Sequence, residues 1–257
     1  MSDDLSVAAA ATRPIPPLRG PAGWQATPIR ECGESLVALS AFAPDRLAVD
    51  PRYHGAGHPG ALPECYVRLT VARRLADAAV RLPAGWRLVI FDAWRPYSVQ
   101  RRLFDSHLAE LRTEQRGVPD EALREQAARY VAPPSVDPTC PSPHATGGAV
   151  DLSLLDGRGA PIPMGTSFDA FDARAHTRYF ERRLEAGERL NASEQACLRH
   201  RRLLFHALRA VGFTNYPEEW WHFDLGNQFH ARITGTHAVY GLAAYRGADG
   251  QPAARAL

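Results

Sequence analysis

The 257-residue chain contains no lysine, so its 30 basic residues are all arginines. With 28 acidic residues they leave a net charge of only +2, which gives no reason to expect a polyanionic partner such as a nucleic acid. Arginine binds phosphate well, but an alanine- and arginine-rich chain is explained more simply by compositional bias. Composition therefore favours neither nucleic-acid nor phosphate binding.

Paired cysteines and long apolar runs are also missing. The four cysteines lie far apart and form no CxxC pair, so a cysteine-based metal or redox site is not supported. No stretch approaches the roughly 20 apolar residues of a membrane helix. The first residues lack the basic start and apolar core of a secretory signal. We therefore expect a cytoplasmic protein without a membrane partner.

The chain has enough apolar residues, 45%, to bury a core. Residues 1–22 are rich in alanine and then in proline, a composition that predicts a flexible tail outside that core. We expect a single domain over residues 23–257. Nothing in the sequence indicates the oligomeric state.

Hydrophobic periodicity predicts helices and short strands in irregular order. Helices are expected at 65–82, 98–111, within 119–130, and at 193–211 with Ser193 as N-cap. Strands are expected at 86–91, 149–155, 162–164 and 220–223. This mixture, without regular alternation, predicts an α+β fold.

Two short stretches, 144–151 and 219–222, contain the residue types of a catalytic zinc site. Such a site needs three protein ligands, an open position for water, and a carboxylate that does not bind the metal. His144, Asp151 and His222 are candidates for the ligands, and Glu219 for the free carboxylate.

The spacing within the first stretch requires a chain reversal. In an extended strand His144 and Asp151 would point to opposite faces, too far apart to share a metal. Gly147 and Gly148 permit a reversal between them because glycine enters positive φ without steric cost. A capped turn followed by a surface aspartate fits this pattern equally well.

The second stretch leaves its local geometry open. Glu219 and His222 would share one side of a helical turn but not of a strand. Glu218 competes for the role of base. Trp220 and Trp221 either shield the site from water or are simply large core residues.

Arg95 follows a predicted strand and precedes Pro96, which would project its guanidinium stiffly into a cleft, where it could stabilise an oxyanion. Any single arginine in this chain is more often a surface group. His54 and His58 have helical i, i+4 spacing, but the glycines and proline around them predict a loop instead.

Three segments together resemble the D-alanyl-D-alanine dipeptidases of the VanX type. They are Phe91 to Pro96 (FDAWRP), Ser142 to Leu154 (SPHATGGAVDLSL) and Gly212 to His222 (GFTNYPEEWWH). They stand in the family's order. The resemblance implies the α+β fold shared with zinc D,D-carboxypeptidases and the hedgehog signalling domain, with a small, mainly antiparallel sheet and flanking helices.

The resemblance also implies roles for single residues. His144, Asp151 and His222 would bind one zinc ion per chain, Glu219 would be the catalytic base, and Arg95 would stabilise the transition state.

Ser142 and Asp169 correspond to family residues that help hold the substrate's ammonium group. The expected activity is hydrolysis of the D-Ala-D-Ala dipeptide. The alternatives are a peptidoglycan carboxypeptidase or endopeptidase, and a non-catalytic zinc-binding module of the same fold.

Overall fold

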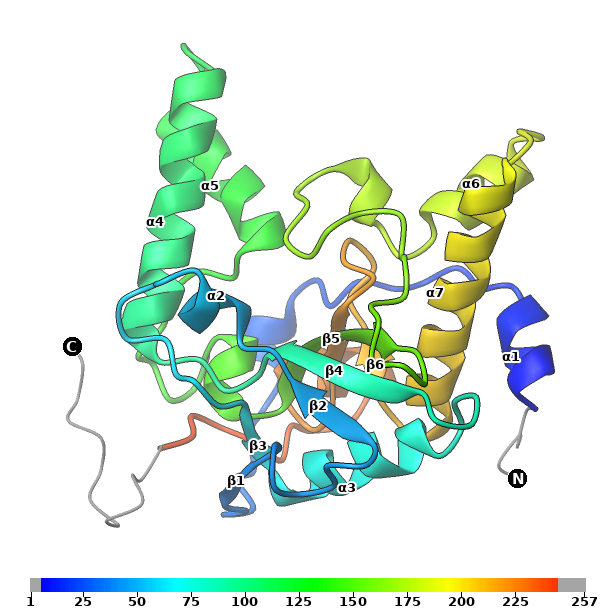
Figure 1. The fold of residues 1–257 in the computed structure, drawn as a ribbon. Coiled ribbons are helices and arrows are strands. Elements are labelled where there is room, and N and C mark those ends of the chain that lie inside the picture. The colour runs from blue at the N-terminus through cyan, green and yellow to red at the C-terminus, as the bar shows by residue number, and fades with distance from the viewer. Residues whose placement is uncertain (1–5, 245–257) are drawn as a thin grey trace.

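A five-stranded sheet forms the centre of the protein in the computed structural model, which describes residues 6–244 (Figure 1). In spatial order its strands are β2 (Leu47–Val49), β4 (Arg87–Asp92), β5 (Ala149–Leu155), β7 (His222–Asp224) and β6 (Thr214–Asn215). Only β2 and β4 are parallel, and the other neighbours are antiparallel. The strands β1 (Leu36–Ala38) and β3 (Tyr66–Arg68) form a separate antiparallel pair. The predicted α+β class with a small, mainly antiparallel sheet is confirmed.

Helices surround this sheet. The two that cover its apolar face are α3 (Leu69–Ala79) and α7 (Ala192–Ala210). The hairpin of α4 (Tyr97–Glu114) and α5 (Asp120–Tyr130) and the pair of α6 (Tyr179–Glu185) and α7 rise at opposite sides of the view in Figure 1. The short helices are α1 (Val7–Thr12), α2 (Arg52–Gly55) and α8 (Gln228–Thr234), with 3-10 turns at Trp24–Ala26, Pro143–Thr146 and Ala173–Ala175.

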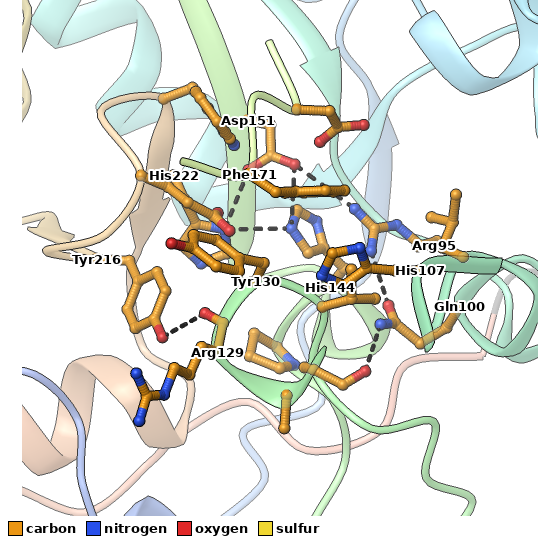
Figure 2. A pocket seen from close by; sticks show the side chains of 18 of the residues that line it. Arg95, Gln100, His107, Arg129, Tyr130, His144, Asp151, Phe171, Tyr216 and His222 are labelled. Carbon is orange, nitrogen blue, oxygen red and sulfur yellow. Dashed lines mark hydrogen bonds and ion pairs between the residues drawn. The ribbon is translucent and has the colours of Figure 1, made fainter. Parts of the chain in front are cut away.

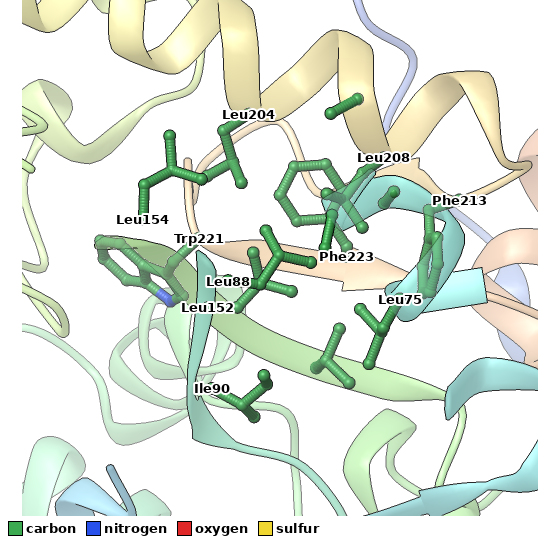
Figure 3. Close-up of a cluster of buried hydrophobic side chains, with 14 of the residues drawn as sticks. Leu75, Leu88, Ile90, Leu152, Leu154, Leu204, Leu208, Phe213, Trp221 and Phe223 are labelled. Atoms are coloured by element: carbon green, nitrogen blue, oxygen red, sulfur yellow. The ribbon is translucent and has the colours of Figure 1, made fainter. Parts of the chain in front are cut away.

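The alternation in β5 separates the core from the site. Val150, Leu152 and Leu154 are fully buried and join the main hydrophobic cluster, to which α3 contributes Leu75 and α7 contributes Leu208 (Figure 3). Because successive side chains of a strand point to opposite faces, Asp151 and Ser153 face away from these helices. The apolar face thus anchors the sheet and leaves the other face for polar groups.

A β-bulge changes this alternation in β4. Leu88 and Ile90 pair with Leu154 and Leu152, but the next pair is Asp92 with Asp151. The register shift leaves Phe91 as an extra residue on β4. Asp92 is thereby placed opposite Asp151, next to the polar face.

Several predicted boundaries differ from the structure. The helix expected from residue 65 begins at Leu69 because the three residues before it pair with β1. Helix α7 is capped by Asn191, which forms a capping box with Glu194, and not by Ser193. In place of the strand expected at 162–164 there is an isolated bridge between Leu155 and Pro161. The strand expected at 220–223 starts at His222, since a turn occupies the residues before it.

The N-terminal segment belongs to the core. Ala10 and Ile15 are buried in the main hydrophobic cluster, and the Ile15 amide donates a hydrogen bond to the Glu181 carboxylate. Arg202 of α7 donates to the Thr12 carbonyl. The expectation that residues 1–22 stay outside the core is therefore wrong for the part from residue 6 onward, because one amphipathic turn and one isoleucine suffice to pack against α7. Residues 1–5 lie outside the described residues. Within residues 6–244, no helix has the length and apolar character needed to cross a bilayer.

Candidate metal centre

Three elements bring His144, Asp151 and His222 together on the polar face of the sheet (Figure 2). His144 lies in the 3-10 turn Pro143–Thr146, and Asp151 and His222 are register partners on β5 and β7. Gly147 ends the turn with φ +71°, so the predicted chain reversal takes place there. All three side chains are buried. Within the described residues they are the only group of three or more His, Cys, Asp or Glu side chains arranged to hold a metal ion.

The spacing of the donor atoms suits zinc. His144 Nε2 lies 3.3 Å from His222 Nδ1. The Asp151 carboxylate lies 3.0 Å from His222 Nδ1 through Oδ1 and 3.4 Å from His144 Nε2 through Oδ2. Ligands at zinc-bond lengths on a tetrahedron are separated by about 3.3 Å. The three groups could therefore hold one zinc ion between them.

The other nitrogen of each imidazole is already bonded. His144 Nδ1 donates to the Ala93 carbonyl at 2.7 Å, and His222 Nε2 donates to the Asp224 carboxylate at 3.2 Å. The remaining nitrogens face each other, an arrangement that is stable only with a proton or a cation between them. In the protein alone, although burial opposes it, Asp224 and Asp151 raise the pKa of His222 well above its ordinary value. The donor set is thus prepared for a cation.

Glu219 lies beside this group without belonging to it. Its carboxylate is 3.8 Å from His222 Nδ1. A turn brings the two together: the Glu219 amide donates to the Tyr216 carbonyl, and the His222 amide donates to the Glu219 carbonyl. Burial, with the charge of Asp151, raises the pKa of Glu219 well above its ordinary value. Glu218 does not line the cavity described below, so the geometry favours Glu219 as the free carboxylate.

Arg95 is buried and held on three sides. Its Nε and Nη2 atoms bond to Asp92 at 2.9 and 2.8 Å, and Nη1 donates to Gln100 at 2.8 Å. Nη2 is also 3.5 Å from the Asp151 carboxylate. The Arg95 amide donates to the His144 carbonyl at 3.3 Å. The guanidinium is therefore fixed beside Asp151 by Asp92 and Gln100, and not by the stiffness expected from Pro96.

A cavity of about 190 Å³ opens over these groups. One wall comes from the α4–α5 hairpin with His107 and Tyr130, and another from the loop that carries Asp169 and Phe171. Figure 2 labels Phe171, His107 and Tyr130 among the side chains that line the pocket together with His144 and His222, and the His107 and Phe171 rings are 4.4 Å apart. The volume is below the roughly 300–1,000 Å³ of pockets for drug-sized ligands, so the cavity suits a small substrate.

The two predicted substrate residues are placed differently. Asp169 lines the cavity, where burial and the charge of Asp151 raise its pKa to about 7, and it accepts a hydrogen bond from Tyr53. Ser142 is buried next to His144 in sequence but is not among the lining residues. The loop predicted for His54 and His58 is wrong for His54, which lies in α2 and bonds to the Ala61 carbonyl, whereas His58 follows that helix and lines the cavity.

Sequence reasoning missed the residues that support this site. Asp92 bonds Arg95 and lies 3.2 Å from His144 Nδ1, and Asp224 orients His222. Both had a signal. Asp92 belongs to the same strand end as Arg95, and Asp224 stands two residues after His222, hence on the same face of a strand. No sequence pattern pointed to Gln100 or Tyr53, because their roles depend on how α4 and α2 pack.

Known proteins were compared with the chain. A family model described as D-ala-D-ala dipeptidase matches residues 62–240. A D-alanyl-D-alanine dipeptidase of Synechocystis sp. is 33% identical over 224 residues, which are 81% of this chain and 88% of that protein. The dipeptidase of Escherichia coli is 32% identical over 142 residues, 55% of this chain and 56% of its own.

Solved structures show a weaker likeness. The vancomycin resistance D,D-pentapeptidase VanY of a VanB-type cassette, in complex with Zn(II), has a TM-score of 0.35 at 16% identity and covers 68% of this chain and 83% of its own. This likeness is too low to carry an argument. The family match contains His144, Asp151, Glu219 and His222, and the relative from Synechocystis is matched over most of the chain. The chain belongs to the D-ala-D-ala dipeptidase family.

Proposed function

We propose that the protein is a zinc-dependent dipeptidase that hydrolyses D-Ala-D-Ala to two D-alanines. The observation that carries the proposal is the triangle of donor atoms in His144, Asp151 and His222, with an unligated buried carboxylate, Glu219, 3.8 Å from one of them. A structural metal has no use for an open position or an adjacent base, so this donor set suits catalysis. The family's named relatives support D-Ala-D-Ala as the substrate.

Glu219 and Arg95 have different roles in the proposed hydrolysis. Zinc, when bound, polarises the scissile carbonyl and acidifies the attacking water. Glu219 takes a proton from that water and delivers a proton to the leaving amine, so the amide C–N bond is replaced by a C–O bond and an N–H bond. A carboxyl whose pKa is raised by burial is suited to return the proton. Arg95, fixed by Asp92 and Gln100, donates to the oxyanion without having to reorganise.

The ends of the substrate supply the selectivity. We assign the free ammonium group to Asp169, whose carboxylate is bonded to Tyr53 and aims into the cavity. Ser142 is proposed as a second contact on the family resemblance alone, since it precedes the turn that carries His144 but does not itself line the cavity. A cavity of about 190 Å³ has room for two alanines and favours a dipeptide over a wall pentapeptide.

The substrate assignment is tested with four compounds. Zinc-replete protein is incubated with D-Ala-D-Ala, L-Ala-L-Ala, N-acetyl-D-Ala-D-Ala and a wall pentapeptide that ends in D-Ala-D-Ala. We expect cleavage of the unblocked D,D-dipeptide alone. Cleavage of the pentapeptide at a comparable rate would favour the carboxypeptidase alternative, and cleavage of none would favour a non-catalytic module.

The role of Glu219 is tested by substitution. Glu219→Gln should abolish turnover while the bound zinc stays near one equivalent, because the carboxylate is not a ligand. Glu218→Gln is the matched control, since it changes the neighbouring carboxylate that lies outside the cavity and should leave turnover intact. An active Glu219→Gln enzyme, or one inactive only because zinc is lost, would contradict the assignment.

A further inference from the structure

The loop from Met164 to His176 carries two residues that line the cavity, Asp169 and Phe171. Apart from the 3-10 turn Ala173–Ala175 it contains no helix or strand. Its conformation therefore depends on what holds it from outside.

Asp169 needs such support because its backbone is strained. Its φ is +59°, and among the described residues it is the only one besides glycines with a positive φ. An L-residue in the left-handed region costs free energy, and such conformations persist only where the surrounding structure enforces them. They are frequent at ligand-binding positions, which agrees with the place of Asp169 in the cavity wall.

Arg201 of α7 holds both ends of this loop. Its Nε donates to the Met164 carbonyl at 2.7 Å, and its Nη1 and Nη2 donate to the carbonyls of His176 and Arg174 at 2.8 Å each. One planar guanidinium thus bonds to a carbonyl before Asp169 and to two after it. A lysine cannot reproduce this fork of donors.

The burial of Arg201 is costly enough to require an explanation. The residue is only 2% exposed, and within residues 6–244 no carboxylate forms an ion pair with it. Burial lowers its pKa to about 9, so it is still charged at neutral pH. Buried charges are usually paired, whereas this one has three carbonyls and the rings of Phe180 and Trp220, at 4.8 and 5.8 Å.

The same contacts connect the loop to the turn of Glu219. The Trp220 indole donates to the Thr166 hydroxyl at 2.8 Å, and its amide donates to the Ala175 carbonyl at 3.0 Å. Arg201 therefore lies behind both the loop with Asp169 and the turn with the base, without touching the cavity itself.

We infer that Arg201 is a positioning residue for substrate binding: by clamping both ends of the Met164–His176 loop it holds Asp169 in its strained conformation and so sets the affinity for the substrate's ammonium group. The inference rests on the proposed function for its kinetic consequence only. The clamp itself is a property of the loop and can be measured without activity.

The kinetic test uses Arg201→Met, which keeps the length and loses all donors. We expect KM for D-Ala-D-Ala to rise about ten- to hundredfold, as for a recognition group displaced by about 1 Å, with kcat changed much less and zinc still near one equivalent. Arg199→Met, an exposed position on the same helix, is the control and should behave as wild type. If Arg201→Met does not fold, Arg201→Lys is used instead, because it keeps the charge but lacks the three guanidinium donors. KM for D-Ala-D-Ala is expected to rise in this variant as well.

A double-mutant cycle separates positioning from general damage. If Arg201 acts through Asp169, Arg201→Met should add little to KM in an Asp169→Asn background. Additive effects, or a loss confined to kcat, would overturn the inference.

Hydrogen exchange of the amides at 165–175 provides the readout that does not depend on turnover. Exchange should accelerate in Arg201→Met and remain unchanged in Arg199→Met. Unchanged exchange in Arg201→Met would refute the clamp. If the wild-type enzyme cleaves no dipeptide but the loop still loosens, then the proposed function fails and the clamp stands.

Discussion

Asp224 offers a sharp test of how the metal centre is organised. It is fully buried and accepts hydrogen bonds through Oδ1 from His222 Nε2 at 3.2 Å and from the Asn227 side chain at 2.6 Å. Its other oxygen has no hydrogen-bond partner among residues 6–244. These contacts keep the proton on Nε2 of His222 and leave Nδ1 free to bind zinc. Asp224→Asn should therefore weaken zinc binding without changing any ligand.

The expected loss of zinc affinity depends on which hydrogen bonds each Asp224 variant retains. An asparagine can keep its oxygen toward His222 and Asn227 and place its amide where the unpartnered oxygen was. Only the charge is lost, and charge-assisted hydrogen bonds are about twice as strong as neutral ones. Loss of an outer partner typically costs 10–100-fold in metal affinity. We expect about tenfold for Asp224→Asn, about 1.4 kcal/mol, and about a hundredfold for Asp224→Leu, which removes the acceptor as well.

Zinc affinity is measured by competition with a chromogenic chelator, and chemical unfolding of the metal-free proteins is measured alongside it. Asp77→Asn, at an exposed position of α3, controls for the loss of one negative charge. If Asp224→Asn and Asp224→Leu both bind zinc within twofold of the wild type while remaining folded, then Asp224 does not determine which nitrogen of His222 is available, and the reasoning fails.

Three further outcomes are expected. The pKa of Asp169 is raised to about 7, and only the ionised carboxylate can hold an ammonium group. The value of kcat/KM for D-Ala-D-Ala should therefore fall as the pH decreases through the pKa of Asp169, which the charge of a bound zinc ion would lower. In Asp169→Asn this decrease of kcat/KM at acidic pH should be absent. Leu152→Ala, at a fully buried position of β5, should lower the free energy of unfolding by about 2–5 kcal/mol in a denaturant titration, and a loss below about 1 kcal/mol would contradict the assigned packing. Gly147→Ala should reduce bound zinc as measured by metal analysis, because φ +71° is strained for a residue with a Cβ and the turn that carries His144 would shift to relieve the strain; full zinc occupancy would count against this.

Those parts of the site that depend only on neighbouring residues in the sequence could be predicted. Asp151 could be assigned to the polar face because Val150 and Leu152 define the apolar one, and this strand has the predicted bounds. The reversal after His144 followed from the need for positive φ, which Gly147 meets. For Glu219 and His222 neither regular geometry applied, because a turn brings them together.

Features that depend on contacts between distant segments were not predictable. The composition of the N-terminal segment gave no indication that Ile15 would join the main hydrophobic cluster and bond to Glu181 of α6, since that depends on contacts with residues far along the chain. The wall formed by the α4–α5 hairpin, with His107, follows from how that hairpin packs around Phe171. The clamp by Arg201 was equally hidden, because one arginine among 30 has no local signature.

The extra residue in β4 has a consequence for how this centre can change. By strict alternation Asp92 would share the face of Leu88 and Ile90, inside the apolar cluster, and only the register shift at Phe91 turns it toward Arg95. Deletion of Phe91 would remove the extra residue and restore plain alternation, and Asp92 would still lie opposite Asp151 on the polar face. What the deletion would remove is the ring of Phe91, which lies 5.3 Å from that of Phe168, so the extra residue gives β4 a contact to the loop that carries Asp169.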